Sequence, residues 1–108
     1  MTATTNTQTN TDGVANRAVG KIIQDATAAV ATTITLGFTP RHVMFVNATD
    51  RIIDEWFEGM ASASSIHTLA AGTISLETTN GIAVSGQSFT VTATTMVASK
   101  TFYWMAQS

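Results

Sequence analysis

The sequence lacks cysteine, contains a single proline, and only 11% of its 108 residues are charged. The absence of cysteine excludes a disulfide framework and a thiolate metal site. Soluble domains usually carry roughly 25% charged residues, whereas this chain is rich in threonine and alanine instead. A surface with so little charge favours coverage by neighbouring molecules in an assembly over existence as an isolated monomer.

The sequence also lacks long apolar runs and clusters of basic residues. No apolar run approaches the 18 or more residues of a membrane span, so we expect no membrane partner. The five cations, Arg17, Lys21, Arg41, Arg51 and Lys100, are scattered. No basic patch is available to neutralise phosphates, so nucleic acid is not an expected partner. No basic segment followed by an apolar one opens the chain, so we expect cytoplasmic synthesis without a secretory signal.

The first 13 residues, MTATTNTQTNTDG, are too polar to contribute to a core. We predict an extended N-terminal arm there, followed by one folded domain over residues 14–108. Threonine favours extended backbone, so the arm can add a strand to a neighbouring chain. An arm folded back on its own domain is the alternative. The residues expected to contact a partner are Thr2, Thr4, Thr5, Asn6, Thr7, Gln8, Thr9, Asn10 and Thr11.

Alternation of apolar and polar residues predicts β-strands through most of the domain. VGKII is a short first strand, and residues 26–38 alternate over a longer stretch. RHVMFVN is apolar on both parities, which is typical of a strand between two layers or in a subunit interface. The later strand segments are RIIDEWFEG, IHTLAAGTISL, IAVS, SFTVTATTMV and TFYWMA.

Turn signals separate these segments. Asn80-Gly81 predicts a type I′ hairpin turn between ISLETT and IAVS, and Gly86-Gln87 predicts a second turn. About eight strands with turns every 8–12 residues indicate an all-β fold. We predict an antiparallel β-sandwich of the jelly-roll or immunoglobulin-like type, with a small barrel as the alternative topology.

The acidic residues around Trp56 are the best candidates for a binding role. On a strand, Asp54, Trp56 and Glu58 point to the same side. This arrangement suits carbohydrate binding with the sugar stacked on the indole, and carboxylate pairs roughly 5–10 Å apart also serve glycoside hydrolysis. The alternative is a solvated strand face with Arg41 or Arg51 paired across it.

The histidines His42 and His67 lie in separate predicted strands with no HxH spacing. As a metal pair they require a carboxylate from elsewhere, and ordinary polar positions on strands are the simpler interpretation. The sequence contains no nucleophile elbow and no glycine-rich phosphate loop. We therefore expect no catalytic activity, no metal and no cofactor.

The last predicted strand is apolar on both parities. It contains Phe102, Tyr103, Trp104 and Met105. Terminal strands often lie at a sheet edge, where an apolar strand favours pairing with another chain. Together with Met44 of RHVMFVN, these residues are candidates for a subunit interface. A core strand in the middle of the sheet is the alternative.

Four segments, LGFTPRHVMFVN, IIDEWFEGM, IHTLAAGTISL and KTFYWMA, together resemble small virion proteins of tailed bacteriophages. In those proteins a GF-P-x-V-x-x-x-N strand pair precedes an acidic-aromatic EW strand. The resemblance spans about residues 34–106 and does not include the arm.

The resemblance implies a capsid decoration, or cement, protein. Such proteins lie on the head exterior, often as homotrimers, and bind the major capsid protein to stabilise the capsid lattice. Synthesis in the host cytoplasm and a final location in the virion follow from this interpretation. The alternative function is a carbohydrate-binding or tail/fibre-associated virion module.

Overall fold

The computed structural model describes residues 16–26 and 29–108, so the arm predicted for residues 1–13 lies outside the described residues. The described chain forms strands and no helix, and none of it is a helical segment suited to crossing a membrane. The strands are β1 (Arg17–Ile23), β2 (Thr32–Thr35), β3 (His42–Asn47), β4 (Ile52–Phe57), β5 (Ser64–Thr68), β6 (Ile74–Ser85), β7 (Ser88–Val91) and β8 (Thr101–Gln107).

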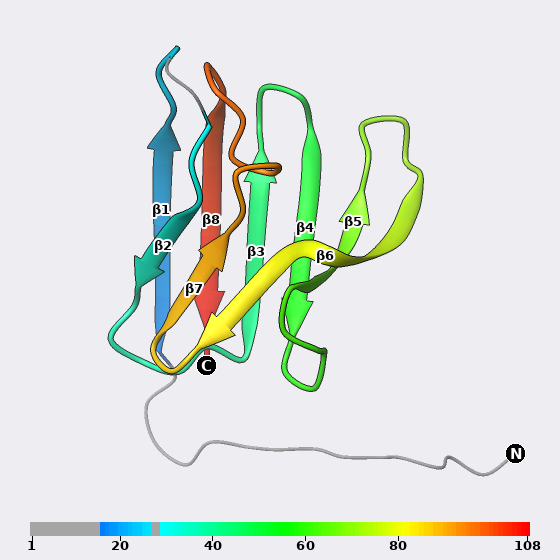
Figure 1. The fold of residues 1–108 in the computed structure, drawn as a ribbon. Helices are drawn as coiled ribbons and strands as arrows, with labels where there is room; N and C mark the ends of the chain where they lie inside the picture. Colours follow the sequence, from blue (N-terminus) through cyan, green and yellow to red (C-terminus); the bar gives the residue numbers. More distant parts are fainter. Residues whose placement is uncertain (1–15, 27–28) are drawn as a thin grey trace, which may run out of the picture.

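All eight described strands belong to one antiparallel sheet with the order β1-β8-β3-β4-β5-β6-β7-β2. Strands β3 to β7 follow one another as a meander, whereas β8 returns to pair with β3 and β1. The sheet curls so that β6, β7 and β2 lie over β3, β8 and β1 (Figure 1). The prediction of an all-β, antiparallel, sandwich-like fold is confirmed, and its two layers are parts of a single sheet.

The curl occurs within β6, because its two halves pair with different neighbours. The first half pairs with β5, and the segment from Ile82 to Ser85 pairs with β7. A β-bulge between Ser64 and Ser65 marks the change of register. Bulges bend a strand and increase its twist, so this one contributes to the fold-over of the sheet.

Gly81 lies at this corner for a steric reason. A Cβ atom added to it would lie 2.4 Å from the carbonyl carbon of Ser64. The Gly81 N–H also donates to the carbonyl oxygen of Ala63 at 3.0 Å. The missing side chain thus permits the close approach of two backbones. The predicted Asn80-Gly81 hairpin turn is wrong, since both residues lie inside the continuous strand β6.

Two other predicted segments differ from the structure. IHTLAAGTISL is a hairpin instead of one strand, because β5 ends at Thr68 and the chain turns through Gly72 at a φ of 92°. The long alternating segment over residues 26–38 contains only the short strand β2, with residues 27–28 outside the description. Alternation alone did not show that Leu36 and Phe38 pack on the core from a loop.

The core fills the space between the two layers. The buried apolar side chains are Val43, Phe45, Trp56, Ile82, Phe89, Val91, Met96, Phe102 and Ala106. Phe89 of β7 contacts Trp104 of β8 edge to face, with ring centroids 5.5 Å apart, and this pair joins the layers. Phe45 and Phe102 stack on neighbouring strands at 5.3 Å. Such aromatic pairs contribute about 0.5–1.5 kcal/mol beyond their burial.

Candidate functional site

The layer formed by β1, β8, β3, β4 and the β5–β6 hairpin has an apolar exterior. Cross-strand partners point to the same side of a sheet, and the register aligns Val19, Met105 and Met44 in one row. We call the set of large apolar residues on this side the outer apolar face. It consists of Val19, Ile23, Met44, Val46, Ile53, Phe57, Ile66, Ile74, Leu76, Tyr103 and Met105.

Several of these side chains are strongly exposed. The exposed fraction is 72% for Val19, 67% for Ile74 and 63% for Leu76. Scattered exposed apolar residues are normal on a monomer, but neighbouring ones on six adjacent strands form an extended surface. Two charged residues lie within it, since Glu55 pairs with Met44 and Ile66, and Lys21 pairs with Tyr103. Burying one such side chain fully contributes about 1.5–3 kcal/mol, so this face favours contact with another apolar surface.

The predicted interface residues divide between the two sides of the sheet. Tyr103, Met105 and Met44 lie on the outer apolar face. Phe102 is fully buried in the core, and Trp104 packs against the core on the same inner side. The expectation that the last strand forms a sheet edge does not hold, because β8 pairs with β1 on one side and β3 on the other.

One end of the outer apolar face is polar. His42 accepts or donates hydrogen bonds on both ring nitrogens, to Glu55 Oε2 at 3.2 Å and to Gln107 Nε2 at 3.2 Å. Its ring also stacks on Phe57, with centroids 4.7 Å apart. Arg17 extends this group through a 3.3 Å hydrogen bond to Gln107. The group limits the apolar surface on this side.

The exterior of the opposite layer has a different composition. The register places Thr33 beside Thr90 and Ala83, and Thr35 beside Ser88 and Ser85. The hydroxyls of Thr33 and Thr90 are 2.8 Å apart and hydrogen-bond to each other. We call this small-residue surface the hydroxyl face. It contains no large apolar side chain among these six positions.

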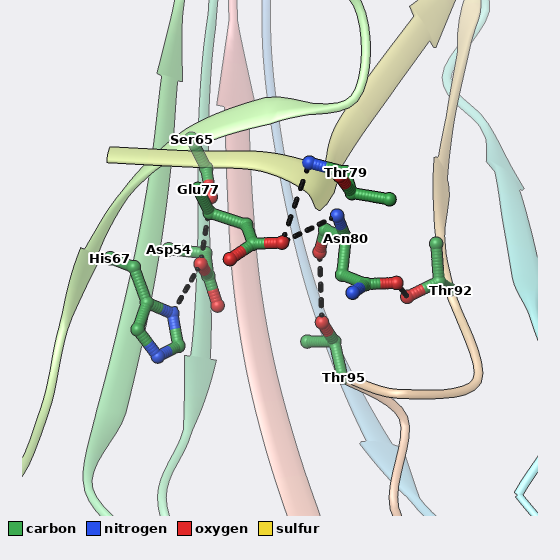
Figure 2. Close-up of polar contacts among 8 residues, drawn as sticks. All are labelled: Asp54, Ser65, His67, Glu77, Thr79, Asn80, Thr92 and Thr95. Atoms are coloured by element: carbon green, nitrogen blue, oxygen red, sulfur yellow. Dashed lines mark hydrogen bonds and ion pairs between the residues drawn. The ribbon is translucent and has the colours of Figure 1, made fainter. Parts of the chain in front are cut away.

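A polar cluster lies on the inner side of the sheet, where β4, β5 and β6 meet (Figure 2). Asp54 is only 3% exposed. Its Oδ1 atom accepts a hydrogen bond from Ser65 Oγ at 2.8 Å and another from His67 Nδ1 at 2.8 Å. These two donors compensate the desolvation of the buried carboxylate.

Glu77 of β6 continues this cluster toward the opposite layer (Figure 2). Its Oε1 atom accepts the backbone N–H of Asn80 at 2.7 Å, and this hydrogen bond is the main cause that lowers the pKa of Glu77 below its usual value. Asn80 in turn accepts hydrogen bonds from the hydroxyls of Thr92 and Thr95, at 3.3 and 3.1 Å. Polar contacts therefore connect β6 to the loop after β7.

These groups border an interior pocket of about 300 Å³ that opens between the layers. Its polar lining includes Asp50, whose pKa is lowered chiefly by the hydrogen bond from Lys100 at 3.1 Å. The full lining is Phe45, Asn47, Asp50, Ile52, Asp54, His67, Glu77, Asn80, Thr94, Thr95 and Val97. A concave site with apolar walls and a few converging polar groups is typical of small-ligand binding.

The residues predicted for sugar binding do not form one surface. Asp54 and Trp56 both face the interior, and the buried Trp56 Nε1 has no hydrogen-bond partner among the described residues. Glu58 follows the end of β4 and forms an exposed ion pair with Arg41 at 3.7 Å. The indole therefore presents no open face for a sugar, and the Arg41 pairing matches the solvated alternative.

The two histidines lie on opposite sides of the sheet, each beside a carboxylate of β4. His42 meets Glu55 on the outer side, and His67 meets Asp54 on the inner side. They therefore share no site. Within residues 16–26 and 29–108, no group of three or more potential ligands is placed to hold a metal ion.

Sequence reasoning overlooked Ile74 and Leu76 as surface residues and Glu77 as a pocket residue. The alternation in ISLETT indicated that Ile74 and Leu76 share one side of the strand while Ser75 and Glu77 share the other.

Comparison with family models, curated proteins and solved structures found no match to this chain.

Proposed function

We propose that this chain is a structural virion protein of the capsid decoration type, which binds the major capsid protein on the head exterior and stabilises the capsid lattice. The observation that carries this proposal is the outer apolar face, an extended and partly exposed apolar surface on a chain with only 11% charged residues. The sequence resemblance to phage virion proteins points in the same direction. No catalytic step is required for this function.

The proposal explains why apolar side chains are retained at exposed strand positions. Contact with a capsid subunit or with a second copy would remove them from water, and each buried side chain favours the assembly. A homotrimer around a capsid symmetry axis would bind through several copies at once. Linked contacts of this kind strengthen binding through effective concentration, although each single contact is weak.

The predicted arm adds a second means of attachment. In the proposal, residues 1–13 lie extended along a capsid subunit and pair with an exposed strand edge. Ordering such a segment costs about 1–2 kcal/mol per residue, which the arm's own backbone hydrogen bonds and contacts must offset. The outer apolar face favours this pairing by keeping the arm close to its partner. Deletion of residues 1–13 is expected to abolish incorporation into heads while the sheet remains folded.

The central experiment places charge on the outer apolar face. Purified heads of the cognate phage that lack decoration protein are mixed with the wild type or with an Ile74→Lys/Leu76→Lys variant, and bound protein is measured after sedimentation. We expect at least about a tenfold loss of binding, since two exposed apolar contacts are replaced by charges. Thr33→Lys/Thr35→Lys on the hydroxyl face is the matched control and is expected to bind as the wild type does.

Two results would contradict the proposal. One is a wild-type protein that stays monomeric at high concentration and does not sediment with heads. The other is an equal loss of binding in the two lysine variants. A glycan screen with the same protein addresses the alternative of a carbohydrate-binding or tail/fibre-associated module, and saturable glycan binding without head binding would favour it.

A further inference from the structure

We propose that the interior pocket binds an aliphatic cation, either an alkylammonium or an alkylguanidinium group with its methylene chain. This site is separate from the outer apolar face and does not depend on the proposed role in capsids. It lies on the inner side of the sheet, between β4, β5 and β6 of one layer and the loop that follows β7 (Figure 2).

Asp54 supplies the first acceptor. Its Oδ1 atom already receives hydrogen bonds from Ser65 and His67. Its Oδ2 atom has no hydrogen-bond partner among the described residues. This oxygen nevertheless keeps some access to solvent. The side chain is only 4% exposed and lines the pocket. The free oxygen of a buried carboxylate therefore faces the pocket, where a donor would compensate its desolvation.

Glu77 supplies the second acceptor from β6, which is separated from β4 by β5. Its Oε1 atom is occupied by the backbone N–H groups of Asn80 and Thr79, at 2.7 and 3.4 Å. Its Oε2 atom has no partner in the described part of the chain and is directed toward Asp54 in Figure 2. Those backbone donors hold Glu77 in its charged form. The carboxylates of Asp54 on β4 and Glu77 on β6 thus line one pocket.

The charge of the lining favours a cation. Three carboxylates line the pocket, those of Asp50, Asp54 and Glu77. Lys100 binds Asp50 at 3.1 Å and neutralises it. His67 is the other basic group at the pocket, and even its protonated form would balance only one of the two remaining charges. A negative pocket with low-polarity walls concentrates cations.

The walls select among cations. Ile52 and Val97 are half-buried and line the pocket beside the carboxylates, so methylene groups find apolar contacts there while an ammonium head meets oxygen acceptors. A bare metal ion is less suited, because no described group of three ligands is in place. A sugar is less suited as well, since the aromatic ring of Phe45 is 1% exposed and stacks on Phe102 instead of offering an open face.

The test uses butylammonium as the probe and the wild-type protein. Amide signals are followed by NMR during a titration, and saturable shifts are expected at His67, Asn80 and Thr94, with a Kd of about 1 mM for so small a ligand. Neutral butanol is expected to bind at least about tenfold more weakly. Absence of saturation by about 10 mM, equal binding of butanol, or shifts confined to the outer apolar face would overturn the proposal.

A pair of variants tests the role of charge. Glu77→Gln retains an oxygen that accepts the Asn80 N–H but loses the charge, and we expect about tenfold weaker binding of butylammonium. Glu58→Gln makes the same chemical change outside the pocket and is expected to leave binding unchanged. Equal weakening in both variants would contradict the site. If Glu77→Gln does not fold, the wild-type shift map decides alone.

The same titration distinguishes two sources of the cation. Tighter binding of an Nα-acetyl-lysine amide than of diaminobutane supports a basic side chain from a partner protein. The reverse order supports a free polyamine. Tighter binding of glucose than of butylammonium would overturn the assignment to a cation.

Discussion

The two exteriors of the curled sheet differ in a way that the composition of the whole chain does not reveal. The outer apolar face presents Val19, Ile74 and Leu76, whereas the hydroxyl face presents Thr33, Thr35 and small neighbours. The hydroxyl face has no charged residue at its six positions, whereas Lys21 and Glu55 lie among the apolar side chains of the other exterior. Low charge therefore does not define a contact surface here, and only the exterior with large apolar side chains has a strong tendency to be buried.

The inner sides of the two layers, in contrast to their exteriors, are alike. Both layers contribute apolar side chains to the common core, for example Phe45 from one and Phe89 from the other. The hydroxyl layer thus alternates between an apolar inside and a polar outside, as in a sheet with one solvated side. The other layer is apolar on both sides over much of its area, which is typical of a sheet covered on both sides.

The largest expected effect comes from removing the corner that separates the two layers. Gly81→Ala would place a Cβ atom 2.4 Å from the Ser64 carbonyl carbon, and we expect a loss of about 3 kcal/mol in the free energy of unfolding. Urea denaturation measures this loss. Gly59→Ala, where the added Cβ has open space and φ is 103°, is the control with an expected loss of about 1 kcal/mol. Equal losses would show that backbone conformation, instead of close approach, explains Gly81.

A smaller effect is expected from the polar cluster between the layers. Asp54→Ala leaves the Ser65 hydroxyl and His67 Nδ1 without their acceptor, so we expect a loss of about 2 kcal/mol. Glu58→Ala removes an exposed ion pair with Arg41 and is expected to change stability by no more than about 0.5 kcal/mol. Thermal and urea denaturation compare the two variants, and similar values would argue against a structural role of the cluster.

A reciprocal exchange sharpens the comparison of the two exteriors with little change in stability. Ile74→Thr/Leu76→Thr makes the outer apolar face more like the hydroxyl face, and we expect weaker self-association and weaker binding of a hydrophobic dye. Thr33→Val/Thr90→Val has the opposite expected effect. Because all four positions are outward-facing, each pair should change the free energy of unfolding by about 0.5 kcal/mol or less. Sedimentation velocity would contradict the comparison if both pairs changed association in the same direction.

The smallest effect concerns pH. The folded-state pKa values of Glu77 and Asp50 are lowered by hydrogen bonds from the Asn80 backbone and from Lys100. A lowered carboxyl pKa stabilises the fold above the unfolded value, and this stabilisation is lost as the pH falls through the folded value. We expect it to be present at neutral pH and to decline below about pH 4.3. Glu77→Gln should flatten this decline in urea denaturation, and an unchanged pH profile would show that Glu77 does not contribute.

The strands of the layer with the apolar exterior could be predicted well from the sequence. RHVMFVN and TFYWMA are apolar on both parities, and the structure explains this because Phe45 and Phe102 face the core while Met44 and Tyr103 face outward. The pattern did not distinguish an edge strand from an internal one. That distinction depends on β8 returning to lie between β1 and β3, a long-range arrangement that leaves no local signal.

The corner and the pocket could not be predicted, because each depends on contacts between distant segments. Asn80-Gly81 has the residue types of a tight turn, but Gly81 is required by the backbone of Ser64 instead. Asp54 and His67 become neighbours only through the register of β4 and β5. The direction of Trp56 was equally undetermined, since strand parity shows which residues share a side and not which side is buried.

The placement of Trp56 and Trp104 has a practical consequence. Both indoles lie on the inner side of the sheet, and Trp104 packs over Gly20 against the core. The chain contains no other tryptophan. Intrinsic tryptophan emission therefore reports chiefly on separation of the layers, whereas the near-ultraviolet absorbance of Tyr103 reports on that exterior. Unfolding and docking can thus be followed by two different optical signals of the unlabelled protein.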